Sequence, residues 1–414
     1  MSAESFIFFI IFLLLIISLF KKDTDVFSPA RLFIIVWSFS LLLVSLKLSG
    51  LQQDWSVYSW FVVLVSLLSV LMGMFIIYVI KFNTKQRRIE DIRENILQFK
   101  INPKLLFKLI VIIFAAYIVS YITIYLVQGF VPFFTAHPNQ TRTKWGLFGL
   151  GLLIHAVPTI VYLVVIYYIK VRGQILRKLV LAFIALISNI TYFFLLQRFD
   201  LIIFIVLSAI FLYYGTKKFK LKYVLFIALI FVLIMYGIST IRAGNLFLEY
   251  LYVMGKMKIS KNLAVLTEPY MYVVMNIENF AHAVHNLSNF SYGYYTFDFI
   301  FALSGLKHWL ADYSHINEFP FLISSDYNTY TMFFAYYRDF GLLGVFIIPT
   351  VIGAAASSIY HKMRVSPSIG TISLYGIVTF VIIFSFFIPM LSWLHFVFNI
   401  GAIYLSTKFI QRAA

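Results

Sequence analysis

The sequence predicts an all-α polytopic membrane protein, and three observations support this fold class. Hydrophobic residues make up 62% of the 414 residues and charged residues only 12%, a composition outside the range of soluble globular domains. Runs such as 105–127 are apolar on nearly every face, and they have the roughly 20 residues that a helix needs to cross a bilayer. Basic residues are concentrated in short loops between these runs.

The individual spans follow from hydropathy. The first apolar run, 6–20, has no basic flank before it and no small-residue cleavage site after it, so it is predicted to be a retained helix and not a signal peptide. In all, the sequence predicts about 11 transmembrane helices, near residues 5–20, 31–48, 57–80, 105–127, 148–169, 176–196, 199–215, 221–239, 340–360, 369–388 and 390–408.

The positions of Lys and Arg predict which side each loop faces. Of the 33 basic residues, 23 lie in alternate loops, at 21–31, 81–108, 170–178, 217–222, 361–364 and the C-terminal end. Because basic loops stay in the cytoplasm, the N-terminus is predicted to be external and the C-terminus cytoplasmic. The net charge of +17 is thus explained by topology and does not indicate nucleic-acid binding. The chain has no cysteine, which excludes disulfides and thiol chemistry.

This pattern divides the chain into three sections: transmembrane helices 1–8 in 1–238, one large external loop in 239–327, and the C-terminal transmembrane helices in 328–414. A loop of this length is usually functional or disordered, and its many aromatic residues indicate order. Pro269 can open a helix in the loop, predicted to pack as an amphipathic helix on the membrane face. Its apolar positions follow the helical period at Tyr270, Val273, Val274, Ile277, Ala281 and Val284.

Arginines on the predicted external side are the first candidates for a binding site. A charge near the hydrocarbon is costly unless it is satisfied, and a guanidinium group offers phosphate oxygens two parallel hydrogen bonds. The alternative is that each arginine reaches lipid headgroups or pairs with a carboxylate, as Arg198 could with Asp200 and Arg338 with Asp339. The candidates for binding an anion with phosphate oxygens are Arg142, Arg198, Arg242 and Arg338.

Glu278, His282 and His285 are the candidates for acid–base chemistry in the external loop. Their spacing of i, i+4 and i+7 places them on one face of a helix. A carboxylate can orient an imidazole that accepts a proton near neutral pH, although the same spacing also suits a metal or a solvated face. The His residues inside apolar spans, His155 and His395, are interpreted as packing or hydrogen-bonding groups. Loop alternatives for the base are Asp298, His308, Asp312 and His315.

Several short motifs occur together in the chain. The most specific is Tyr337-Arg338-Asp339-Phe340-Gly341-Leu342-Leu343-Gly344, which follows Asn328-Thr329-Tyr330. The others are Gly129-Phe130-Val131-Pro132-Phe133-Phe134 ahead of Arg142, Gln197-Arg198-Phe199-Asp200, and Arg242 before the long loop. Together they resemble the bacterial oligosaccharide repeat-unit polymerases of the Wzy type, which are related to the O-antigen ligases, and the four arginines would then bind the diphosphate. The Arg-x10-Gly pattern of some family members is absent after all four arginines.

The resemblance implies a glycosyltransferase of the GT-C type in the bacterial inner membrane, active on the periplasmic side. It would polymerise undecaprenyl-diphosphate-linked oligosaccharides, which serve as donor and acceptor, into O-antigen or a similar surface polysaccharide of lipopolysaccharide type. The resemblance implies no cofactor and no metal, and a chain-length regulator and a flippase as candidate partners beside membrane lipid. His282 or Glu278 would take the acceptor proton, and four tyrosines would shape the sugar cleft: Tyr270, Tyr292, Tyr294 and Tyr295.

Three other functions remain open at this stage. An O-antigen ligase would share nearly every feature. A lipid-linked oligosaccharide flippase or other transporter would also be basic and polytopic, but transporters usually contain internal repeats, which this sequence lacks. An acyltransferase acting on surface sugars would favour a histidine within a span, such as His155 or His395.

Overall fold

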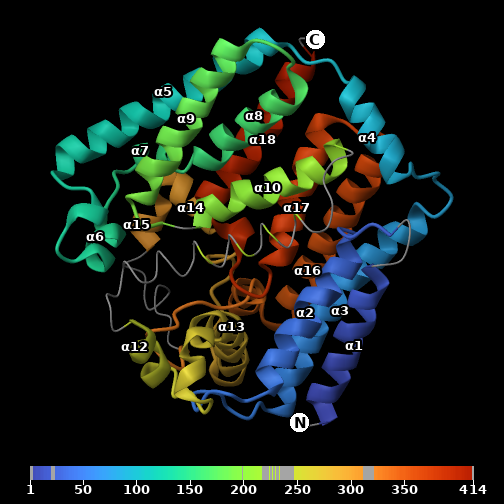
Figure 1. Cartoon of the computed structure of the whole chain (residues 1–414). Coiled ribbons are helices and arrows are strands. Elements are labelled where there is room, and N and C mark those ends of the chain that lie inside the picture. Colours follow the sequence, from blue (N-terminus) through green and yellow to red (C-terminus); the bar gives the residue numbers. More distant parts are fainter. Residues whose placement is uncertain are drawn as a thin grey trace. The chain divides into compact units, whose positions relative to one another are not determined.

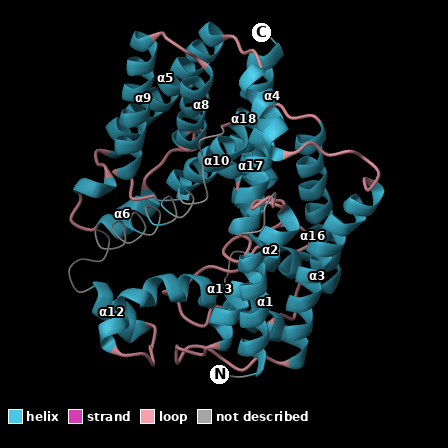
Figure 2. Cartoon of the chain, turned by 45° about the vertical axis from the view of Figure 1, so that its right-hand side comes forward, coloured by secondary structure: helices cyan, strands magenta, loops and turns pink. Residues whose placement is uncertain are grey.

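The computed structural model is helical wherever it describes regular structure (Figures 1 and 2). It describes residues 3–19, 24–197, 199–216, 247–310 and 321–412, together with positions 223, 226, 229 and 233. No strand occurs in these ranges, where extended pairing is limited to an isolated bridge between Ser49 and Met257. The all-helical part of the predicted fold class is therefore confirmed.

Five helical segments are long and apolar enough to cross a membrane, judged by length and composition. They are Val57–Ile80, Pro103–Phe134, Leu150–Lys170, Ile175–Phe193 and Phe333–Val365. Shorter apolar helices are Ser5–Leu19, Pro29–Ser45, Phe199–Gly215 and Ile369–Ile383. These segments support a membrane-embedded protein, whereas the total of 11 spans and the sidedness stay predictions. The predicted span 221–239 lies almost entirely outside the described residues.

The chain forms two compact units, and each combines three segments that are separated in the sequence. Unit 1 comprises Met1–Gln86, Leu246–Lys362 and Val381–Leu394, and unit 2 comprises Arg87–Asn245, Met363–Phe380 and His395–Ala414.

Unit 1 is built around α13, the central helix of the long loop. In the views of Figures 1 and 2, α1, α2 and α3 lie side by side, and α13 packs against α2 and α3. The helices that lie wholly or mainly in unit 1 are α1 (Ala3–Leu19), α2 (Pro29–Ser45), α3 (Val57–Ile80), α12 (Phe247–Met254), η2 (Lys261–Leu266), α13 (Thr267–Asn286), α14 (Asp298–Ser304), α15 (Leu306–Leu310), α16 (Phe333–Val365) and η3 (Met390–Ser392).

Two glycines let α3 and α16 approach each other closely. A Cβ atom built on Gly73 would lie 1.9 Å from the carbonyl oxygen of Thr350, and one built on Gly353 would lie 2.0 Å from that of Val70. Both distances are far below van der Waals contact, so only glycine fits at either position. Small residues at a helix crossing are typical of helices that pack within a membrane.

Unit 2 is a second helical bundle, in which α8 packs against α5, α9 and α10. Buried tyrosines join its helices: the Tyr162 hydroxyl of α8 lies 2.7 Å from the Ser373 hydroxyl of α17. Its helices are α4 (Ile89–Gln98), α5 (Pro103–Gln128), η1 (Pro132–Phe134), α6 (Pro138–Lys144), α7 (Leu150–Ile154), α8 (Val157–Lys170), α9 (Ile175–Phe193), α10 (Phe199–Gly215), and most of α17 (Ile369–Ile383) and α18 (Leu394–Arg412).

The helix predicted to begin at Pro269 is α13, and its environment differs from the predicted one. Every residue from Val274 to Ala281 is buried, including three polar ones. Asn279 Nδ2 donates to the carbonyl oxygens of Tyr327 (2.6 Å) and Thr329 (2.9 Å), so this polar side chain is satisfied inside the unit. The prediction of an amphipathic helix on the membrane face is therefore corrected: α13 is a central helix whose polar groups hold neighbouring segments.

Candidate functional site

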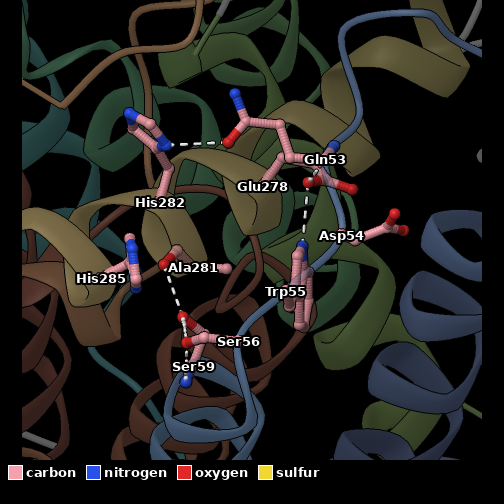
Figure 3. A pocket seen from close by; sticks show the side chains of 9 residues that line it. All are labelled: Gln53, Asp54, Trp55, Ser56, Ser59, Glu278, Ala281, His282 and His285. Atoms are coloured by element: carbon pink, nitrogen blue, oxygen red, sulfur yellow. Dashed lines mark hydrogen bonds between the residues drawn. The ribbon is translucent and has the colours of Figure 1, made fainter.

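A pocket of about 200 Å³ lies in unit 1 between α13 and the segment that precedes α3 (Figure 3). His282 and His285 lie on one side of it and Trp55 on the other. The N-terminus of α3 is fixed beside α13, because the Ser59 hydroxyl donates to the carbonyl oxygen of Ala281 at 2.9 Å. The lining residues are Gln53, Asp54, Trp55, Ser56, Ser59, Glu278, Ala281, His282 and His285.

Glu278 holds the segment before α3 in place. Its Oε1 accepts a hydrogen bond from Gln52 Nε2 (3.1 Å), and its Oε2 accepts from Trp55 Nε1 (2.9 Å) and the Gln53 amide (3.3 Å). Glu278 is 1% exposed, and this burial raises the pKa of its carboxyl above the ordinary value, despite the three donors. Since these donors already occupy both oxygens, the carboxyl has a positioning role in this geometry.

His282 is better placed than Glu278 to accept a proton. Its Nδ1 donates to the Gln53 side-chain oxygen at 2.9 Å, which leaves Nε2 as the acceptor. Burial, and then the neighbouring His285, lowers the pKa of His282, so the ring is neutral at neutral pH. The structure thus brings all three residues of the i, i+4, i+7 set to one pocket, with His285 exposed at its edge.

Arg338 is a buried cation near the start of α16. It is 8% exposed, its Nη1 donates to the Asn289 carbonyl oxygen at 2.8 Å, and its guanidinium carbon lies 5.9 Å from the centre of the Phe321 ring. The Tyr295 side chain also forms a hydrogen bond with it, whereas Arg338 Nε has no hydrogen-bond partner. In the part of the chain that the structure describes, no carboxylate forms an ion pair with Arg338.

Asp339 does not pair with Arg338, in contrast to one alternative from the sequence. Its carboxylate accepts hydrogen bonds from the Ser291 hydroxyl (2.5 Å), the Tyr295 amide (3.2 Å) and the Thr296 amide (2.6 Å). Gly341 follows with φ 60° and ψ −141°, a conformation essentially restricted to glycine, and breaks the helix. The Asp-Phe-Gly motif therefore holds the 291–296 segment against the start of α16, and its carboxylate does not pair with Arg338.

The four tyrosines predicted for a sugar cleft are not gathered at one place. Tyr270 is buried, and its hydroxyl lies 2.7 Å from Gln52 Oε1. Tyr294 is buried against Phe301, Tyr292 is 82% exposed, and Tyr295 forms a hydrogen bond with Arg338. A shared sugar cleft therefore stays a prediction, with Tyr295 the member closest to a candidate anion site.

The predicted arginine cluster is described only in part. Arg142 lies in the last turn of α6 in unit 2, and Arg338 lies in unit 1. Arg198 and Arg242 lie outside the described residues, as do the alternatives Asp312 and His315 and the side chain of His308. Asp298 forms an ion pair with Lys307, 2.5 Å from Oδ1 to Nζ. Convergence of the arginines on one anion stays a prediction.

Unit 2 contains a polar cluster that was not predicted from the sequence. His155, Asp200 and His395 come together there, each close to the start of a helix, although they were interpreted as packing or as an arginine partner. Nothing in the local sequence relates them, because they are separated by 45 and 195 positions.

Comparison with known proteins returns no match for this chain, whether with family models, curated sequences or solved structures. Functional arguments therefore depend on the residues and their geometry.

Proposed function

We propose that this protein is a membrane glycosyltransferase that polymerises lipid-diphosphate-linked oligosaccharide repeat units into a surface polysaccharide. The proposal includes the 11 spans, a GT-C architecture, and an active site on the periplasmic side of a bacterial inner membrane. It is supported by the motifs that resemble the Wzy-type polymerases and by the apolar helices of both units.

The observation that carries the proposal is the environment of Arg338. A buried guanidinium is costly without an anion, and within the described residues its contacts are a carbonyl oxygen, a tyrosine and an aromatic ring. A phosphate group supplies both the charge and the paired acceptor oxygens that a guanidinium fork prefers. Arg338 directly precedes the Asp-Phe-Gly motif, whose carboxylate is held by three hydrogen bonds.

The reaction follows from these groups. The hydroxyl of the acceptor sugar attacks the anomeric carbon of the donor chain, and the bond from that carbon to the diphosphate oxygen breaks. The lipid diphosphate leaves with negative charge, which Arg338 stabilises together with the predicted partners Arg142, Arg198 and Arg242. His282 Nε2 accepts the hydroxyl proton, with its ring held by Gln53 and indirectly by Glu278.

A polymerisation assay tests the proposal. The purified full chain in detergent is incubated with a lipid-diphosphate-linked repeat unit from its own host, without nucleotide or added metal, and glycan lengths are resolved. We expect a ladder from the wild type. Arg338→Gln should reduce its rate about 100-fold or more, the cost typical of removing a donor to transition-state charge. Arg338→Lys should restore only part of the polymerisation rate, because lysine lacks the planar guanidinium group that donates two parallel hydrogen bonds.

The matched control is Arg93→Gln. Arg93 also donates to a backbone carbonyl, that of Tyr213, and lies 5.1 Å from the centre of an aromatic ring, but it belongs to a predicted cytoplasmic loop. This variant should polymerise at the wild-type rate. Unchanged substrate with folded wild-type protein would contradict the polymerase proposal, and transfer only to a lipid A core acceptor would replace it with a ligase.

A further inference from the structure

Three side chains with metal-binding chemistry meet in unit 2. His155 lies between α7 and α8, Asp200 in the first turn of α10, and His395 in the first turn of α18. One donor atom from each lies within 4.8 Å of the other two. Two imidazoles and one carboxylate are a donor set suited to divalent transition metals such as Zn²⁺.

The carboxylate of Asp200 is held firmly but incompletely. Its Oδ2 lies 2.6 Å from His155 Nδ1 and accepts a hydrogen bond from the Tyr192 hydroxyl at 2.8 Å. Among the described residues its buried Oδ1 has no hydrogen-bond partner, and the residue as a whole is only 1% exposed. A buried carboxylate oxygen normally has a partner, and a cation would satisfy this one.

A second layer of hydrogen bonds fixes the two histidine-bearing segments relative to each other. Asn399 Nδ2 donates to the carbonyl oxygens of His155 (2.7 Å) and His395 (2.9 Å), while Thr159 Oγ1 donates to Asn399 Oδ1 at 2.7 Å. Supporting hydrogen bonds that fix the ligands in this way are a regular feature of metal sites. These hydrogen bonds also hold the two imidazoles close together within the bundle.

We propose that His155, Asp200 and His395 bind one divalent transition-metal ion, with Zn²⁺ as the first candidate. The ion replaces the proton between His155 and Asp200 and satisfies the free Oδ1. The two imidazole rings are stacked, with centres 4.5 Å and planes 28° apart, so one ring turns about its side-chain bonds to direct its nitrogen at the ion. The His155 side chain is 24% exposed, which gives the ion a route in and leaves a coordination position for water.

Metal binding is measured directly on the full chain in detergent after chelator treatment. Zn²⁺ binding is followed by equilibrium dialysis with elemental analysis, and Co²⁺ binding by its visible absorption. We expect one ion per chain and a Co²⁺ spectrum typical of nitrogen and oxygen ligands. Asp200→Asn and His395→Gln preserve side-chain volume. Each should weaken metal binding about 100-fold or more, because the loss of a residue that only supports a ligand by a hydrogen bond already costs up to about 100-fold in affinity.

The double variant His282→Ala/His285→Ala is the matched control, because it removes two histidines that also lie near a buried carboxylate, in unit 1. It should bind Zn²⁺ like the wild type. Thermal unfolding of each variant identifies loss of fold. Asn399→Ala keeps all three metal ligands, so it should weaken binding less than Asp200→Asn. The proposal is overturned if wild-type protein binds no stoichiometric ion, if folded Asp200→Asn binds normally, or if the control variant loses binding.

Discussion

Glu278 shows how one buried carboxyl organises the candidate site in unit 1. Its three donors come from 52–55, the segment that also supplies Gln53 to His282. The residue that orients the proposed base is thus itself positioned by Glu278. Removing the carboxyl should therefore affect the stability of the unit and the alignment of His282 together.

Glu278→Ala should lower the free energy of unfolding by about 2 kcal/mol, because three partly buried donors lose their acceptor. Burial raises the folded-state pKa of Glu278 above its ordinary value of 4.5. The contribution of the Glu278 carboxyl to the free energy of unfolding is thus fully present below pH 4.5 and decreases as the pH rises through the folded-state pKa. The difference in unfolding temperature between wild type and variant should be larger at pH 4.5 than at pH 8.

The exposed Glu249→Ala in α12 is the control for this experiment, and it should leave the unfolding temperature almost unchanged at both pH values. A Glu278→Ala variant as stable as the wild type, or a difference that grows toward pH 8, would contradict the prediction.

Individual site residues were only partly predictable from sequence. The helical spacing of Glu278, His282 and His285 was enough to place them at one pocket, because a helix fixes which side chains share a face. Gln53 and Trp55 were not predictable as their neighbours, since more than 200 positions separate them from α13. The separation of Arg338 from Asp339 was also not predictable, because the adjacent carboxylate looked like its partner, whereas the structure gives that carboxylate three other donors.

At the scale of elements, hydropathy located the helices that are apolar on all sides. The predicted range 57–80 coincides with α3 and 199–215 with α10. The predicted start near residue 340 lies at the break in α16 at Gly341, whereas the helical stretch before it, from Phe333, was not predicted, because Arg338 and Asp339 made it look like a loop. Likewise α13 looked amphipathic because the partners of its buried polar groups lie far away in sequence.

The crossing of α3 and α16 yields a prediction about packing. Gly73→Ala should destabilise the protein by about 3 kcal/mol or more, because the new methyl group would overlap the Thr350 carbonyl oxygen and force the helices apart. Gly401→Ala in α18 is the control: nothing lies within 4 Å of its added Cβ, so it should be neutral or stabilise the helix by about 0.5–1 kcal/mol. Unfolding in detergent measures both, and equal stabilities would show that the crossing does not form.

For the whole molecule, the charge pattern predicted sidedness but not the two units. Alternating basic loops depend only on local composition, which a sequence displays directly. The two units each combine segments far apart in the sequence, such as α1 with α16 in unit 1 and α5 with α18 in unit 2. Such long-range partnerships depend on side-chain packing that hydropathy does not encode.

Sidedness can be tested in unit 1, where α3 separates two exposed positions. The bond from Ser59 to Ala281 fixes the C-terminal half of α13 beside the start of α3, so Ser288 follows α13 near that end. Thr84 follows the other end of α3. With 24 residues, α3 is about 36 Å long, more than the hydrocarbon thickness of a bilayer.

Because the chain has no cysteine, Thr84→Cys and Ser288→Cys each introduce a single reactive thiol. The test uses cells from which the outer barrier has been removed while the inner membrane stays closed. A membrane-impermeant maleimide should label Ser288→Cys at once in these cells, since 239–327 is predicted to be external. It should label Thr84→Cys only after the membrane is permeabilised, since the basic loop 81–108 is predicted to be cytoplasmic. Labelling of both from the same side would mean that α3 does not cross the membrane, and the predicted topology would be wrong from its third span onward.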